Sequence, residues 1–294
     1  MKRPAVIFFM AALFSVCHGS CFAFEWKPLH EKADKISLAE ALAKAGSGSA
    51  SREDLYMLGL VYLNRREDQK AGDIFNRMLS ADKENPAARW GIAEVLRRGH
   101  RAAESEKMLE EVIKSAPAFA PAYNSLAYIA YQKMDFNKAI RLARKVLDMG
   151  RENVDTSNYA RAYLMLGGSK GMLAHYGGPF SKIIDGTAVF PLLKKAEALQ
   201  PDAPAVLFGM GNFYLLAPTL AGGNKEKAGE YLEKAVKADP LFADIYVRLA
   251  QSYKVKGDNA KYQAYLSKAL EIDPKNELAL DVKNGTCRFI CTGS

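Results

Sequence analysis

The feature that most constrains this chain is a pattern of small and apolar residues that recurs every 34 residues. The recurring residues are Leu58-Gly59, Ile92-Ala93 and Leu126-Ala127 and, at a fixed distance after each pair, Ala71, Ser105 and Ala139. A period of this length is typical of a helix-turn-helix unit that buries its apolar faces only when copies of it stack. The stack leaves a curved surface free for other molecules. The sequence therefore predicts an all-α solenoid that acts by binding.

The ends of the later units are marked by proline. Pro201, Pro240 and Pro274 each follow a helical run, which proline cannot continue, and the last two are again 34 residues apart. Together these positions resemble the tetratricopeptide repeat (TPR) family. The resemblance implies a right-handed α-solenoid of about six TPR helix pairs over residues 52–276. The predicted units lie near residues 52–85, 86–119, 120–153, 160–203, 204–242 and 243–276.

A solenoid needs a cap at each end to cover the apolar face of its last unit. Residues 24–51 form the predicted N-terminal cap, with one short amphipathic helix over residues 36–45. Residues 277–294 form the predicted C-terminal cap and tail. No linker divides the array, so we expect a single domain.

Two units depart from the repeat length. The fourth contains about ten extra residues, which we place around Gly177-Gly178-Pro179. The fifth contains about five extra residues near Pro218 and Gly222-Gly223, where proline disfavours helix and glycine permits positive φ. Both insertions fall between the first and second helix of a unit, so we expect them on the same edge of the solenoid.

The first 23 residues have the layout of a secretory signal. Basic residues precede an apolar stretch, and small residues end at Ala23, after which we expect cleavage. The apolar stretch is too short to span a membrane. We therefore expect export across the inner membrane into the periplasm. Membrane attachment would require lipidation of Cys17 or Cys21, and neither has the leucine-like residue that usually precedes such a site.

Charge and motifs exclude several classes of function. The formal net charge is +8, or about +6 without Lys2 and Arg3, and the basic residues are spread over many helices, so we expect no nucleic-acid partner. His30, His100 and His175 have no neighbour at metal-ligand spacing. No phosphate loop, dinucleotide fingerprint or nucleophile motif is present in the sequence. These observations favour a protein without a metal, a cofactor or catalytic activity.

Two cysteines follow the array. Cys287 and Cys291 lie four residues apart near the carboxyl end, and an oxidising exported compartment would allow them to pair. A disulfide that fixes the tail is the interpretation we favour. The alternatives are free thiols and a ligand or redox pair, although this is not the usual redox spacing.

The first helices of TPR units line the concave face of the superhelix, so residues on that face are candidates for partner binding. The predicted partner-binding residues are Tyr56, Trp90, Arg97, Arg98, Asn124, Tyr128, Tyr131, Phe208 and Asn212. Aromatic rings supply buried area, and an asparagine amide both donates to and accepts from a peptide backbone. The lining therefore suits an extended peptide or a partner helix. The alternative is that some of these rings pack against the next repeat.

A second resemblance covers residues 160–276. The segment Ala217–Ala228, with its Pro218 and Gly222-Gly223, is similar to a turn of periplasmic TPR proteins associated with TRAP transporters. The resemblance implies an oligomer with an apolar channel that pairs with a solute-binding protein. Our main hypothesis is thus an exported scaffold for a protein or peptide partner. The alternative is a transport component that also binds a small apolar ligand.

Overall fold

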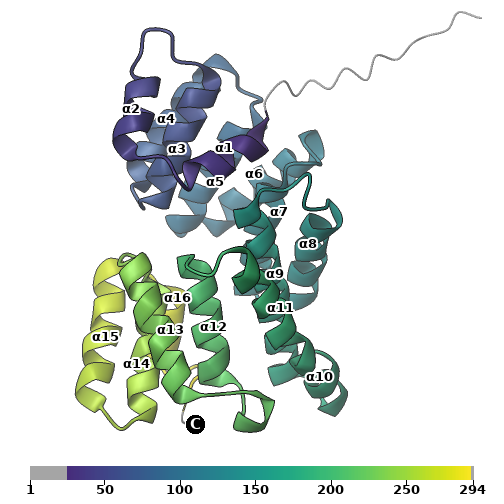
Figure 1. Ribbon diagram of the computed structural model, residues 1–294, viewed down its shortest axis with the longest axis vertical. Coiled ribbons are helices and arrows are strands. Elements are labelled where there is room, and N and C mark those ends of the chain that lie inside the picture. Colours follow the sequence, from purple (N-terminus) through teal and green to yellow (C-terminus); the bar gives the residue numbers. More distant parts are fainter. Residues whose placement is uncertain (1–24, 293–294) are drawn as a thin grey trace, which may run out of the picture.

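The computed structural model describes residues 25–292, and the predicted signal at residues 1–23 lies outside the described residues. Within this part of the chain six antiparallel helix pairs follow one another without any strand (Figure 1). The pairs are α3 (Arg52–Asn64) with α4 (Asp68–Ala81), α5 (Pro86–Arg98) with α6 (Ala102–Ser115), α7 (Ala120–Gln132) with α8 (Phe136–Asp148), α9 (Thr156–Tyr176) with α11 (Gly186–Leu199), α12 (Pro204–Leu216) with α13 (Lys225–Ala238), and α14 (Ala243–Val255) with α15 (Asn259–Ile272). The predicted all-α solenoid is confirmed. No helix among residues 25–292 is both long and apolar enough to cross a membrane.

Local signals at the helix ends reinforce the repeat spacing. Ser51 and Asp54 form a capping box at the start of α3, and Asn85 caps α5 directly before Pro86. The capping oxygen accepts a hydrogen bond from a free amide of the first turn, and proline has no amide to leave unpaired there. Each of these helices therefore begins where the period requires it.

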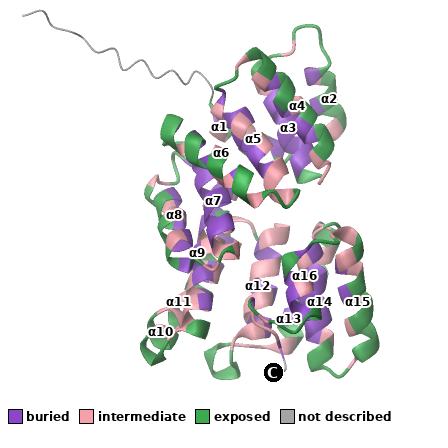
Figure 2. Ribbon diagram, turned by 180° about the vertical axis from the view of Figure 1, so that it is seen from behind, coloured by how far each residue is buried: buried purple, intermediate pink, exposed green. Residues whose placement is uncertain are grey.

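The first and second helices of a pair are buried to different extents, as α3 and α4 show. In α3 every residue from Leu55 to Leu63 is buried, and much of α7 is buried too (purple in Figure 2). In α4 only one face is buried. An amphipathic helix has one face in water, whereas a helix buried all round has neighbours on every side. The concave side of α3 must therefore be covered as well.

Close packing between the first two pairs depends on glycine. The Phe75 ring of α4 is fully buried. A Cβ atom added at Gly59 or Gly91 would approach carbons of this ring to 2.5 or 2.4 Å. A residue without a side chain leaves room for the ring at both places, which explains why small residues belong there.

The amino-terminal cap contains two helices rather than the single one predicted. α2 (Leu38–Ala45) packs on α3 within the predicted segment, and α1 (Trp26–Ala33) precedes it. The prediction misses α1 because its sequence, WKPLHEKA, contains Pro28 and few apolar residues, whereas α2, of equal length, reads LAEALAKA. At the other end, α16 (Glu277–Lys283) closes the array.

The two insertions take different forms. α9 begins at Thr156, earlier than the predicted start at residue 160, and continues to Tyr176. Gly177-Gly178-Pro179 then separates α9 from the short helix α10 (Pro179–Ile184). In the fifth repeat a turn of 3-10 helix, η1 (Thr219–Ala221), ends at Gly222, whose φ of 97° is left-handed. α10 and the turn that contains η1 lie at the same end of the molecule, the lower end in Figure 1.

The superhelix turns far enough to bring its first repeat into contact with the fifth and its second with the sixth. Arg66, in the turn after α3, forms an ion pair with Asp239, in the turn after α13, at 2.7 Å. One repeat further along on both sides, His100 Nε2 lies 2.8 Å from the Asp273 carboxylate. Arg66 and His100 occupy the same repeat position and have φ values of 59° and 61°. Such left-handed backbone is uncommon for residues other than glycine, and here it carries the side chains that close the molecule.

Candidate functional site

The concave face of the first repeats is covered by α1 of the same chain. His30 Nε2 lies 2.8 Å from the Tyr56 hydroxyl oxygen, and the Trp26 ring packs edge-on against Phe119 with centroids 5.3 Å apart. The Asn158 side-chain nitrogen on α9 lies 3.3 Å from His30 Nδ1. α1 thus contacts both α3 and α9 and joins the first repeat to the fourth.

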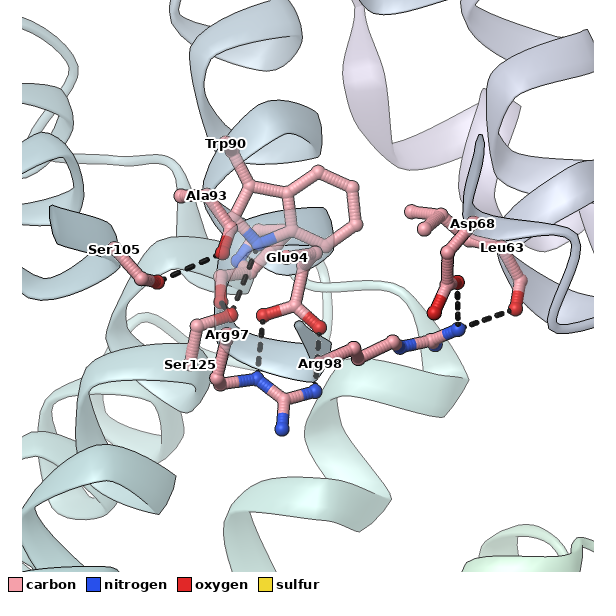
Figure 3. Close-up of polar contacts among 10 residues, drawn as sticks. Leu63, Asp68, Trp90, Ala93, Glu94, Arg97, Arg98, Ser105 and Ser125 are labelled. Carbon is pink, nitrogen blue, oxygen red and sulfur yellow. Dashed lines mark hydrogen bonds and ion pairs between the residues drawn. The ribbon is translucent and has the colours of Figure 1, made fainter. Parts of the chain in front are cut away.

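Tyr56 and Trp90 are therefore not available to a partner, which corrects their predicted role. Tyr56 is 0% exposed and Trp90 is 4% exposed. The Trp90 indole N–H donates a hydrogen bond to the Ser125 hydroxyl at 3.0 Å (Figure 3). The repeat positions place both rings on first helices as expected, but the chain's own α1 covers them.

The charged residues near the end of α5 are held by contacts within the array (Figure 3). Arg97 donates two hydrogen bonds to the Glu94 carboxylate, at 2.8 and 3.1 Å. Burial of the Glu94 carboxyl opposes its ionisation, but the Arg97 guanidinium outweighs this and lowers its pKa to about 2. Arg98 donates to the Leu63 carbonyl and to the Asp68 carboxylate, both at 2.8 Å. Both guanidinium groups thus have protein partners, which the repeat positions alone do not reveal.

The two candidate asparagines differ in what they contact. Asn124 is buried, and its side-chain amide donates to the Asn158 carbonyl oxygen at 2.9 Å. Its predicted role in partner binding is therefore replaced by a link between α7 and α9. Asn212 on α12 makes no hydrogen bond within the described residues, and its Oδ1 atom, like that of Asn124, is buried without a partner. The difference between the two is the amide nitrogen, which has an acceptor in Asn124 and none in Asn212.

The C-terminal tail covers the inner face of the last repeats in a similar way. The Arg248 guanidinium donates to the carbonyl oxygens of Phe289 and Ile290, at 2.6 and 2.7 Å. The Phe289 ring stacks on Tyr131 with centroids 6.0 Å apart. Burial raises the pKa of the Tyr131 hydroxyl to about 12. Tyr131 is thus engaged by the tail, contrary to its predicted role as a free partner-binding residue.

The tail is also held within itself. A disulfide joins Cys287 to Cys291. The Asp281 carboxylate of α16 accepts hydrogen bonds from the backbone amides of Arg288 and Phe289, at 2.9 and 3.0 Å. The tail therefore forms an ordered loop whose shape suits the face that it covers.

The inner face also carries Tyr128, Phe208 and Asn212, which are half-buried. The Arg97 guanidinium lies over the Tyr128 ring, 4.6 Å from its centroid, and the Phe208 ring is tilted against Phe242 at 5.3 Å. A cavity beside α1 has a volume of about 20 Å³, and one beside the tail about 90 Å³. Small-molecule sites usually measure roughly 300–1,000 Å³. These two cavities are therefore of a size for a few water molecules.

The residues that fill the concave face carry a weak signal of their own. Trp26, His30 and Ala33 have the spacing of one helix face, and all three are buried. Because they precede the first repeat, the repeat pattern does not include them. In residues 25–292 no three histidine, cysteine or acidic side chains are grouped so that they could hold a metal ion.

Comparison with known proteins agrees with the repeat architecture. Residues 91–154 match the tetratricopeptide repeat family, and residues 180–285 match the family described as TRAP transporter T-component. No curated protein is significantly similar in sequence to this chain. A thermophilic TPR protein of Thermus thermophilus superposes with a TM-score of 0.55 at 20% identity, over 68% of this chain and 97% of that one. A TPR protein of Parabacteroides merdae gives a TM-score of 0.52 at 14% identity, over 88% of this chain and 98% of that one. Both resemblances expected from the sequence are confirmed.

Proposed function

We propose that this tetratricopeptide repeat protein is an exported adaptor that binds a partner protein and acts as the T-component of a TRAP-type transport system. The observation that carries the proposal is the match of residues 180–285 to that family. The matched segment contains α12, on which Asn212 has no hydrogen-bond partner among the described residues, and the Gly222-Gly223 turn. A periplasmic location and binding without catalysis fit this assignment.

The inner face of α12 is the proposed binding surface. Phe208 and Asn212 are four residues apart, so they lie on the same side of the helix one turn apart. The Asn212 side-chain amide makes no hydrogen bond among the described residues, and because its Oδ1 atom is buried, we expect its nitrogen to be the group that binds; Phe208 offers a half-buried ring. This pair suits an extended segment of a partner protein, whose backbone supplies a carbonyl oxygen. The surfaces under α1 and the tail are already occupied.

A small apolar ligand is a weaker candidate than a protein segment. The cavities beside α1 and the tail have volumes of only about 20 and 90 Å³. Both are lined in part by polar or charged residues, such as Arg98 in the first and Gln251 in the second. These two cavities therefore do not suit an apolar ligand, and the proposal rests on the protein partner that the TRAP resemblance implies.

Titration calorimetry with the solute-binding protein of a TRAP transporter from the same organism tests the proposal. We expect Asn212→Ala and Phe208→Ala each to weaken binding by roughly 1–3 kcal/mol, the usual cost of truncating a central interface residue. Asn76→Ala is the matched control, because Asn76 is exposed on the second helix α4. Unchanged affinity in both α12 variants would exclude this surface, and lack of binding by the wild type would exclude the assigned partner.

A further inference from the structure

Most of the large apolar side chains that are exposed in the described chain lie on one edge of the molecule. This loop edge comprises residues 176–190, 217–227 and 254–258, which are the connections between the first and second helices of the last three repeats together with the adjoining helix ends. Its exposed apolar residues are Tyr176, Phe180, Ile183, Ile184, Phe190, Leu220 and Val255. The three segments lie at the lower end in Figure 1, and much of them is green in Figure 2. A concentration of this kind usually marks an interaction surface.

The side chains at the tips of the loop edge are almost fully in solvent. Phe180 is 82% exposed and Leu220 is 104% exposed. Beside these insertions α11 and α12 are joined by an aromatic contact, since Phe190 stacks on Phe213 with centroids 5.0 Å apart. A Cβ atom added at Gly222 would lie 3.6 Å from the same Phe213 ring. The two insertions therefore lie beside one aromatic contact, and their exposed tips project from it.

The charge on the loop edge is positive. Lys182, Lys227, Lys254 and Lys256 form no ion pair within residues 25–292. The acidic residues nearby are mostly neutralised: Asp185 pairs with Lys170 at 2.6 Å, and Asp258 pairs with Lys261 at 3.6 Å. Glu226 alone adds an unpaired negative charge among the described residues of this edge. The loop edge thus combines projecting apolar tips with a surplus of unpaired lysines.

We propose that the loop edge docks on the surface of a bilayer that contains anionic phospholipid. The aromatic and aliphatic tips would enter the boundary between headgroups and acyl chains, and the lysines would bind lipid phosphates. Charge complementarity favours this occupant over a second copy of the chain, because two lysine-rich edges repel each other. Phe180 and Leu220 are separate, nearly fully exposed tips. Such tips can insert one by one into a fluid bilayer, whereas a protein partner would need a rigid surface that is complementary to both. Membrane docking does not depend on the partner protein proposed for α12.

Sedimentation with large vesicles tests the proposal on the purified mature protein. We expect binding to vesicles that contain phosphatidylglycerol, little binding to pure phosphatidylcholine, and weaker binding at high salt. The double substitution Phe180→Ser with Ile184→Ser should reduce binding about tenfold or more, because it removes two inserting side chains. The double substitution Lys182→Glu with Lys227→Glu should also reduce vesicle binding, because it reverses two positive charges and leaves the apolar side chains in place. Both variants change exposed residues, and thermal unfolding verifies that they fold.

Leu241→Ser is the matched control, because Leu241 is 51% exposed but lies in the turn after α13, outside the loop edge. Its vesicle binding should equal that of the wild type. Failure of the wild type to sediment with phosphatidylglycerol vesicles would overturn the proposal, as would equal binding by the Phe180/Ile184 variant. Light scattering tests whether a second copy of the chain, rather than a bilayer, covers the loop edge. A dimer that this double substitution dissociates, without vesicle binding, would show that a second copy covers the edge.

Discussion

His30 is the residue that connects α1 most closely to the array. Its ring is buried between the Tyr56 hydroxyl and the Asn158 amide. Burial lowers the pKa of His30 to about 4, while Asp155 opposes this and Arg161 adds to it. A neutral imidazole has one donor and one acceptor nitrogen, and it can serve both neighbours at once. The docked position of α1 therefore requires the uncharged form.

We expect the protein to lose stability as pH falls from about 6.5 to about 4, the His30 pKa in the unfolded and folded chain. In this range the unfolded chain binds a proton that the folded chain does not, so protonation favours unfolding. The contribution of neutral His30 to the free energy of unfolding is fully present above pH 6.5 and amounts to roughly 3 kcal/mol. Urea unfolding at a series of pH values measures it.

His30→Gln is the comparison for this pH dependence. Glutamine can still contact the Tyr56 hydroxyl but does not titrate. The free energy of unfolding of the variant should vary less with pH between 4 and 6.5 than that of the wild type. Parallel curves for the two proteins would mean that His30 is not the group responsible.

Among the structural elements, the tail at residues 286–292 is attached to the inner face through the side chain of Arg248. Arg248 is buried and donates to two consecutive carbonyl oxygens of the tail. The planar guanidinium fits such a pair, whereas the ammonium of lysine is a compact charge on a flexible stem. Burial lowers the pKa of Arg248, and the nearby Tyr131 and Asp244 oppose this. The same group thus holds the tail over the inner face.

Arg248→Lys should release the tail locally without unfolding the array. Loss of one charge-assisted hydrogen bond costs about 1.5–3 kcal/mol. The amides of Arg288 and Phe289, which donate to Asp281, should then exchange with solvent roughly ten- to a hundredfold faster. Hydrogen exchange measured by mass spectrometry tests this. Arg288→Lys is the control, because the Arg288 guanidinium makes an exposed contact with the Gln132 carbonyl and lies 5.5 Å from the centroid of the Phe289 ring; equal exchange in the two variants would contradict the role of Arg248.

Across the whole molecule, two contacts close the superhelix between distant repeats. The Arg66 guanidinium pairs with Asp239 and lies 4.7 Å from the centroid of the Phe242 ring. His100 and Asp273 form the second contact. A solenoid is otherwise held only by neighbouring repeats, so its curvature is easily changed. These contacts therefore limit how far the two halves can separate.

The double substitution Arg66→Gly with His100→Gly should open the molecule. Glycine is favoured at this left-handed position, as Gly257 of the last repeat shows with its φ of 78°, so the turns themselves should persist. We expect a larger radius of gyration by X-ray scattering and a loss of about 1–2 kcal/mol in the free energy of unfolding. Arg65→Ala is the control, since Arg65 pairs with Glu67 in its own turn. An unchanged radius would show that the ion pairs do not set the curvature.

Sequence reasoning was sufficient for the helix pairs, their order and the positions that face inward. A period of 34 residues determines these locally, through small residues such as Gly59 and end signals such as Asn85. It also places Phe208 and Asn212 on one side of α12. Whether an inward-facing residue is covered depends on contacts between distant parts of the chain, and the repeat period does not predict these contacts. Arg66 meets Asp239 across 173 positions, and His30 meets Asn158 across 128. Such pairs exist only once the solenoid has curved, because its curvature brings the ends of the chain onto the face that the repeats leave open.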